Sequence, residues 1–105
     1  MSDANSRIKL DDDLRALFGP KVNIYFQPPE SMKMKYPAFR YRYIGTNRKF
    51  ANGKPFISND LYEGMLIVSG SESVYSKKLL EMPYVHLDRV YTANNLTHYS
   101  YTITI

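Results

Sequence analysis

Residues 38–44 read AFRYRYI, and this short stretch decides the fold class. Phe39, Tyr41 and Tyr43 alternate with Arg40 and Arg42, which is the period-2 pattern of a half-buried β-strand. One face of such a strand is aromatic and the other is basic. The segment therefore predicts a sheet with one packed face and one cationic face.

Further strand candidates lie on both sides of this one. Residues 22–27 (VNIYFQ) precede two prolines, and residues 61–68 (LYEGMLIV) form the most apolar segment, which is typical of a central strand. Residues 85–91 and 99–105 supply two more, and the last of them, YSYTITI, alternates throughout. These segments predict a largely antiparallel sheet.

Two short helices are predicted beside the strands. The first is expected to follow the acidic run Asp11–Asp13, which suits a helix N-terminus, and to end at Gly19-Pro20; its apolar face is Leu14, Leu17 and Phe18. The second is expected to begin after Ser71 or Ser73 as a cap and to end at Pro83, with Leu80 beside its apolar face. That face consists of Tyr75, Leu79 and Met82.

The pattern as a whole predicts an α+β domain, a mainly antiparallel β-sheet with two short helices packed on one face. Residues 1–6 are expected to form a flexible tail and residues 7–105 a single domain. Asn52-Gly53 and Pro55 predict a turn, so residues 45–60 are expected to form a projecting hairpin arm.

Composition excludes several classes of protein. The 105 residues are 44% hydrophobic and 23% charged, which is ordinary globular usage and excludes collagen-like, coiled-coil and fully disordered chains. The absence of cysteine excludes disulfide scaffolds, zinc–thiolate sites and cysteine nucleophiles. No apolar run is long enough to span a membrane, and the acidic N-terminus does not resemble an export signal, so we expect neither a membrane location nor secretion.

The net charge of +4 is concentrated in one stretch. Residues 31–59 contain seven basic residues and no acid, whereas the rest of the chain carries seven basic and ten acidic residues. A solvated sheet face, contact with an acidic protein and contact with nucleic acid are all compatible with this pattern. The candidate interface residues are Lys33, Lys35, Arg40, Tyr41, Arg42, Tyr43, Arg48 and Lys49.

Candidate catalytic residues are few. His86 and Asp88 would share one face of a strand, and with His98 they could hold a metal ion or act as an acid–base group. The spacing matches no zinc signature, and hydrogen bonding within a turn is the simpler explanation. The sequence also lacks nucleophile-elbow, P-loop and dinucleotide-binding motifs. We therefore expect no enzyme activity, cofactor or metal.

Two strings of residues resemble a family of small bacteriophage neck proteins, the tail-completion or tail-terminator proteins. The first string is Asn23–Ser31 followed by Met34–Ala38, and the second is Leu80–Tyr84 followed by Asp88-Arg89 and Tyr91–His98. The resemblance extends from about Leu14 to the C-terminus. The chain departs from the family pattern at residues 68–73, where an acidic turn is usual, and at Asn94, where Asp is more usual.

The resemblance implies a tail-terminator-like fold and a virion structural protein, made in the bacterial cytoplasm and located in the tail or neck. It implies a homohexameric ring on the last ring of tail tube protein, which stops tail polymerisation and joins the tail to head-side neck or connector proteins. Sheath protein would be a further partner in a contractile tail, and DNA would only pass through the lumen. No catalytic residues follow from it. A small basic nucleic-acid-binding module is the alternative.

Overall fold

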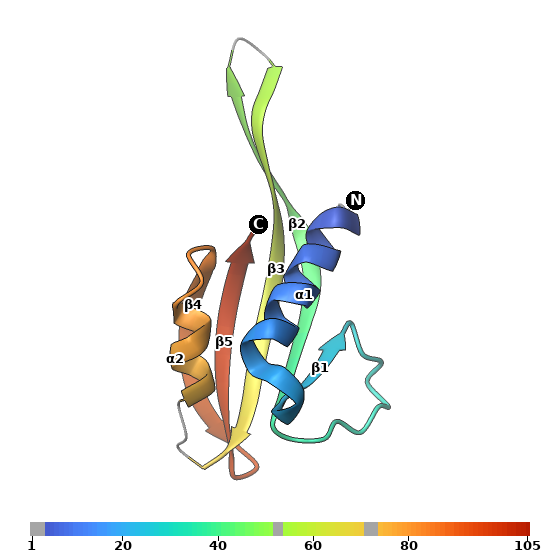
Figure 1. Cartoon of the computed structure of the whole chain (residues 1–105), viewed down its shortest axis with the longest axis vertical. Helices are drawn as coiled ribbons and strands as arrows, with labels where there is room; N and C mark the ends of the chain where they lie inside the picture. The colour runs from blue at the N-terminus through green and yellow to red at the C-terminus, as the bar shows by residue number, and fades with distance from the viewer. Residues whose placement is uncertain (1–3, 52–53, 71–73) are drawn as a thin grey trace.

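A long antiparallel hairpin dominates the computed structural model of the chain (Figure 1), which describes residues 4–51, 54–70 and 74–105. Its strands are β2 (Ala38–Ala51) and β3 (Lys54–Ser69). The other elements are α1 (Ala4–Phe18), a 3-10 turn (Gly19–Lys21), β1 (Asn23–Phe26), α2 (Val74–Leu80), β4 (Val85–Ala93) and β5 (Leu96–Thr104). None of the described helices is both long and apolar enough to cross a membrane.

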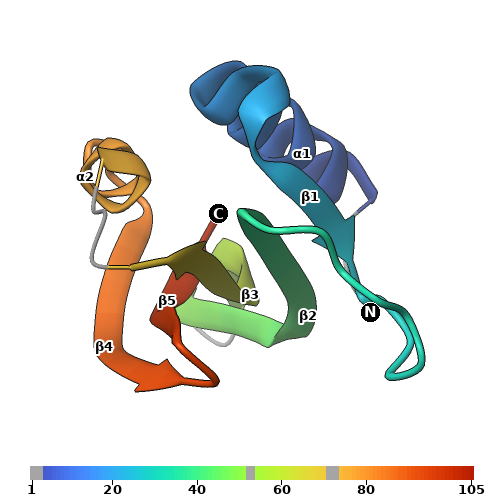
Figure 2. The same cartoon turned by 90° about the horizontal axis from the view of Figure 1, so that it is seen from below.

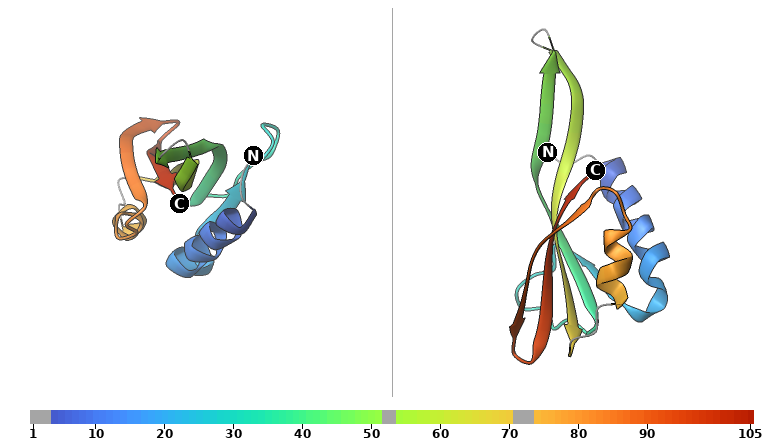
Figure 3. Two further views of the ribbon diagram at one scale, coloured as in Figure 1. Left: turned by 90° about the horizontal axis from the view of Figure 1, so that it is seen from above. Right: turned by 90° about the vertical axis from the view of Figure 1, so that its left-hand side faces the viewer.

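The five strands form one sheet in the order β1-β2-β3-β5-β4. β1 runs parallel to β2, and every other pair is antiparallel. β3 is the central strand, as its apolar sequence predicts, and both helices lie on the same face of the sheet (Figures 2 and 3). The predicted α+β architecture is therefore confirmed.

Side chains on the two faces of the sheet separate as the alternation in residues 38–44 predicts. Phe39 and Tyr41 are buried under the helices, whereas Arg40 and Arg42 are exposed on the opposite face. In β5, Tyr101 and Ile103 are completely buried. The sheet therefore has a packed face toward the helices and a face without helices, which we call the outer face.

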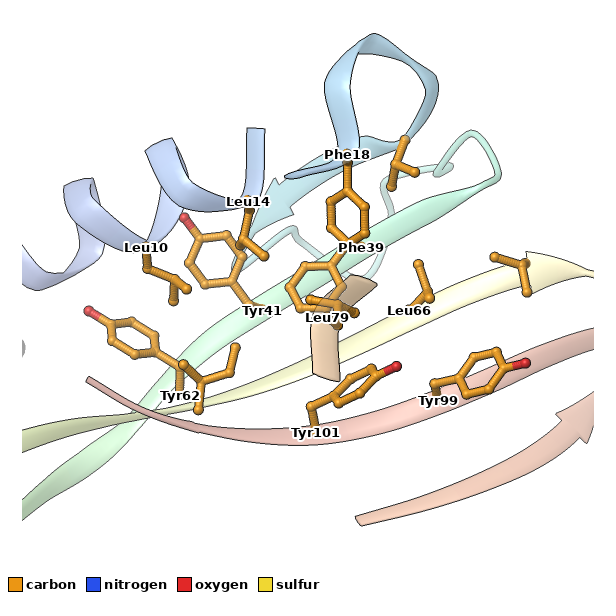
Figure 4. Packing of buried hydrophobic residues seen from close by; sticks show 13 residues of the cluster. Leu10, Leu14, Phe18, Phe39, Tyr41, Tyr62, Leu66, Leu79, Tyr99 and Tyr101 are labelled. Atoms are coloured by element: carbon orange, nitrogen blue, oxygen red, sulfur yellow. The ribbon is translucent and has the colours of Figure 1, made fainter. Parts of the chain in front are cut away.

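The core lies between the two helices and the packed face (Figure 4). α1 contributes Leu10, Leu14 and Phe18, and α2 contributes Leu79, all of them buried. Leu17, predicted to belong to the apolar face of the first helix, packs only at the edge of this core, and Leu80 is 48% exposed. Each fully buried aliphatic or aromatic side chain contributes about 1.5–3 kcal/mol to folding, so this cluster is the main source of stability.

Gly64 lets an aromatic ring sit directly on β3. A Cβ atom at this position would lie 2.5 Å from Cζ of Phe39 and 3.3 Å from Cδ1 of Ile103. Two neighbouring strands therefore place their side chains over the bare backbone of Gly64, and the core closes around it.

The first helix begins earlier than the sequence predicted. α1 starts at Ala4, so residues 4–6 are helical and do not form a tail; residues 1–3 lie outside the described residues. Asp11 and Asp13 consequently lie in the middle of α1, where they pair with Arg15 at 2.7 Å and Lys9 at 2.9 Å. These pairs, four residues apart, stabilise the helix surface, so the acidic run does not mark the helix N-terminus.

The hairpin extends beyond the rest of the sheet as a two-stranded arm (Figures 1 and 3). Its pairing continues from Gly45–Leu61 to Ala51–Lys54, with register shifts after Tyr43 and after Lys49. The arm gives the molecule its elongated shape of 51 × 26 × 25 Å. The predicted Asn52-Gly53 turn and the predicted helix caps Ser71 and Ser73 lie outside the described residues.

Candidate interaction surfaces

The base of the arm is fixed by a cluster of polar side chains around Asp60, which is 7% exposed. Its carboxylate accepts hydrogen bonds from Ser6 of α1 (2.6 Å) and Thr46 of β2 (3.1 Å). The hydroxyl of Tyr62 lies 3.0 Å from that of Ser6, and the hydroxyls of Tyr43 and Thr46 lie 2.5 Å apart. The cluster therefore joins the start of α1 to the point where the arm leaves the sheet.

Two tyrosines, the buried Tyr41 and the partly buried Tyr84, donate hydrogen bonds to the aspartates of α1. The hydroxyl of Tyr41 donates to Asp11 at 3.0 Å, and that of Tyr84 donates to Asp13 at 2.6 Å. The hydroxyl of Tyr101 donates to Ser76 of α2 at 2.8 Å. These contacts give each hydroxyl a partner and connect both helices to the sheet, a function of the acidic run that the sequence did not reveal.

The buried phenols are harder to ionise than free tyrosine. Burial, followed by the neighbouring aspartates, raises the pKa of Tyr41 and Tyr84 well above the usual value near 10. Burial likewise raises the pKa of Tyr101 to about 12. Hydrogen bonds from Tyr84 and then Lys9 hold the pKa of Asp13 below its usual value.

Because these phenols have higher pKa values in the folded than in the unfolded chain, we expect unfolding in alkali. The contribution of these phenols to the free energy of unfolding is complete below about pH 10. It is lost as the pH rises through their pKa values in the folded protein. For Tyr101 this effect amounts to a few kcal/mol, at about 1.4 kcal/mol per pKa unit. When the protein is followed from neutral pH to about pH 12, the part of the tyrosinate absorbance that comes from these phenols should therefore rise together with the loss of the circular dichroism signal.

Tyrosine-to-phenylalanine variants provide the control for this titration. Tyr101→Phe should move alkaline unfolding to higher pH, because it removes a buried phenol that ionises on unfolding. Tyr36→Phe, at a side chain that is 46% exposed, should leave the transition unchanged. Ionisation of all tyrosines near pH 10 in a still folded protein would contradict the prediction.

The outer face carries two of the predicted interface residues, Arg40 and Arg42. They lie two positions apart on β2, which corresponds to about 7 Å. The guanidinium of Arg42 donates to Glu63 at 3.1 Å, and that of Arg40 contacts the sulfur of Met65 at 3.5 Å. The strand alternation thus places both cations on the face that the helices leave open.

The remaining predicted interface residues are distributed differently. Lys33 and Lys35 are exposed in the loop between β1 and β2, which lies on the side of the sheet away from the helices (Figure 3). The backbone of Arg48 and Lys49 lies in the arm, and their side chains lie outside the described part of the structure. The predicted set therefore covers the outer face, the adjacent loop and the arm.

Grouping Tyr41 and Tyr43 with the arginines was wrong. Tyr41 is 1% exposed and points into the core, and Tyr43 is half-buried against the ring of Tyr62. Adjacent residues of a strand point to opposite faces, so these rings cannot share a contact surface with Arg40 and Arg42. Their role is to pack the core and to support the base of the arm.

The three residues considered for metal binding or acid–base chemistry do not form a site. His86 lies 3.8 Å from Asp88, whose carboxylate also accepts a hydrogen bond from Thr102 at 2.7 Å. His98 lies in β5 and stacks on Tyr91 with ring centroids 4.8 Å apart. In the described part of the chain, no three metal-ligating side chains gather.

Comparison with known proteins returns no match, whether to a protein-family model, a curated protein or a solved structure.

Proposed function

We propose that this chain is a bacteriophage virion structural protein, a tail terminator or tail-completion protein. In this role it forms a ring, a hexamer in the family it resembles, at the head-proximal end of the tail tube. The ring stops tail polymerisation and joins the tail to the neck and head, and DNA passes through its lumen. The proposal assigns the chain no catalytic activity.

The arm is the observation that carries this proposal. Its two strands pair with one another from Gly45–Leu61 to Ala51–Lys54, beyond the part of the sheet that the helices cover (Figure 1). An isolated two-stranded ribbon is only marginally stable in water, because it has no core of its own. An arm that packs on the neighbouring subunit would obtain that support from the assembly.

The shape also suits a ring. Ring closure requires heterologous contacts, in which one patch of a subunit meets a different patch of its neighbour. The arm, at one end of a molecule 51 Å long, and the body of the neighbouring subunit could form such a pair. The partners that we propose are therefore a second copy of this chain, the tail tube protein and head-side neck proteins.

Electron microscopy of particles assembled without this protein tests the proposal. We expect overlong tails or filled heads separated from tails, and supplying the protein from a plasmid should restore normal particles. Normal, infectious particles in its absence would contradict the assembly role. A nucleic-acid-binding module would then be the next candidate, and its binding should weaken steeply as salt rises.

A further inference from the structure

A cleft on the outer face is the strongest unassigned feature of the described surface. It has a volume of about 530 Å³ and is lined by the two residues that follow β1 and by residues of β2 and β3. Gln27 and Pro28 form one side, and Arg40, Arg42, Glu63 and Met65 are among the residues that form the floor and the other side. We call this feature the arginine cleft.

The two arginines of the cleft differ in their ion pairing. Arg42 is paired with Glu63, directly opposite it on β3. Among the described residues, no carboxylate lies within ion-pair distance of Arg40, whose guanidinium contacts only the sulfur of Met65. Arg40 therefore offers a cation with free donor groups beside an apolar thioether.

The wall of the cleft is held in place by hydrogen bonds. Gln27 makes two hydrogen bonds to β2. Its N–H donates to the carbonyl of Tyr41 (2.9 Å), and its side-chain Oε1 accepts from the N–H of Tyr43 (3.2 Å). Further along the loop, the N–H of Lys35 donates to the hydroxyl of Tyr25, and the side chain of Asn23 donates to the carbonyl of Lys35, both at 3.0 Å. The cleft is thus formed before a partner arrives.

The loop beside the cleft has the composition of a protein interface. Met32 is 45% exposed and Tyr36 is 46% exposed, and the exposed Lys33 and Lys35 lie between them in the sequence. Methionine, tyrosine and arginine are enriched where proteins meet, because they combine large apolar area with a polar end. Pro28, at the start of this loop, lines the cleft, so the loop begins at its edge.

We propose that the arginine cleft docks a segment of another virion protein that presents a carboxylate side chain next to an apolar one. The carboxylate would accept hydrogen bonds from the guanidinium of Arg40, and the apolar side chain would pack on Met65. This inference rests on the proposed assembly role, because it names the chemistry of one partner in that assembly.

Glu63 argues for a protein partner and against a nucleic acid. A polyphosphate strand that followed the cleft from Arg40 to Arg42 would meet the carboxylate of Glu63, which already neutralises Arg42. Tyr41, grouped with these arginines in the predicted interface, is buried under the helices, so its ring is not available for a base to stack on. One carboxylate placed on Arg40 avoids this repulsion.

Fluorescence anisotropy of the purified full chain tests the proposal with defined probes. The first probe is a soluble labelled peptide in which Glu and Leu are spaced by Gly and Ser, the second is the same peptide with Lys in place of each Glu, and the third is a DNA duplex. We expect the Glu peptide to bind more tightly than the other two. Arg40→Glu should weaken its binding about tenfold or more, since it removes one charged hydrogen-bonded partner.

A matched variant separates this effect from a change in overall charge. Lys77→Glu makes the same charge reversal at an exposed position of α2, on the helix side of the sheet, and should leave binding of the Glu peptide unchanged. Circular dichroism should show both variants folded, because both side chains are exposed.

Two results would overturn the inference. One is equal binding of the Glu and Lys peptides; the other is tighter binding of DNA, lost in Arg40→Glu. These results are independent of the particle experiment. Abnormal particles without peptide binding would refute only the role of the cleft. Peptide binding with normal particles would refute the assembly role, and with it the virion partner, but not the preference of the cleft for a carboxylate.

Discussion

A Leu66→Asp variant of this chain is expected to be unfolded at room temperature. Leu66 is completely buried in β3, the central strand of the sheet, where it lies between Phe39 of β2 and Tyr99 of β5. Loss of the leucine side chain alone costs about 2–5 kcal/mol. A carboxylate at this position must also lose its hydration or be protonated, which adds several kcal/mol, so the total approaches the 5–15 kcal/mol that holds a typical domain folded.

Circular dichroism and urea titration measure this effect, and two variants control for it. Leu66→Met keeps the volume and should cost less than about 1.5 kcal/mol. Leu80→Asp places the same charge on a side chain that is 48% exposed and should change stability by about 0.5 kcal/mol or less. A cooperative urea transition of Leu66→Asp near that of the wild type would show that β3 is not the centre of the core.

Shortening the arm is expected to abolish assembly while the body stays folded. In the variant that we suggest, residues 48–58 are replaced by Asn-Gly, so that a two-residue turn joins the paired positions Asn47 and Asn59. Thr46 and Asp60 remain, and with them the hydrogen bonds at the base of the arm. The core lies between the helices and the sheet, so it should be unaffected.

The expected result is a protein with nearly wild-type melting behaviour that fails to restore normal tails to particles made without the natural chain. Thermal melting of the purified variant, followed by circular dichroism, checks that the body stays folded, and electron microscopy of the particles checks the loss of assembly. An unfolded variant would show that the arm stabilises the monomer. Normal tails with the shortened arm would remove the main support for the proposed ring contact.

The strands were predictable because their signal is local. Alternation in residues 38–44 and 99–105 gives the face of each side chain directly, and the apolar sequence of residues 61–68 indicates a central strand. The order β3-β5-β4 and the parallel pairing of β1 with β2 were not predictable from these patterns. They depend on contacts between segments that lie far apart in the chain.

The helix start and the cleft were missed for similar reasons. Asp11 and Asp13 look like helix-capping residues in the sequence, but their partners Tyr41 and Tyr84 belong to later elements. Glu63 joins Arg42 only through the register between β2 and β3. A charge count over residues 31–59 gives a uniformly basic segment. In the folded protein Arg42 is paired with Glu63, whereas Arg40 has no ion-pair partner among the described residues.

The position of β5 constrains how the chain can fold during synthesis. β5 follows the other four strands of the described sheet in sequence, yet it lies between β3 and β4 and pairs with both. The β2–β3 hairpin can form as soon as it leaves the ribosome, because its pairs are close in sequence, but the core still lacks Tyr99, Tyr101 and Ile103. Nascent chains therefore expose an apolar sheet face until β5 has left the ribosome, and a truncated product that lacks β5 should be recognised by chaperones or proteases.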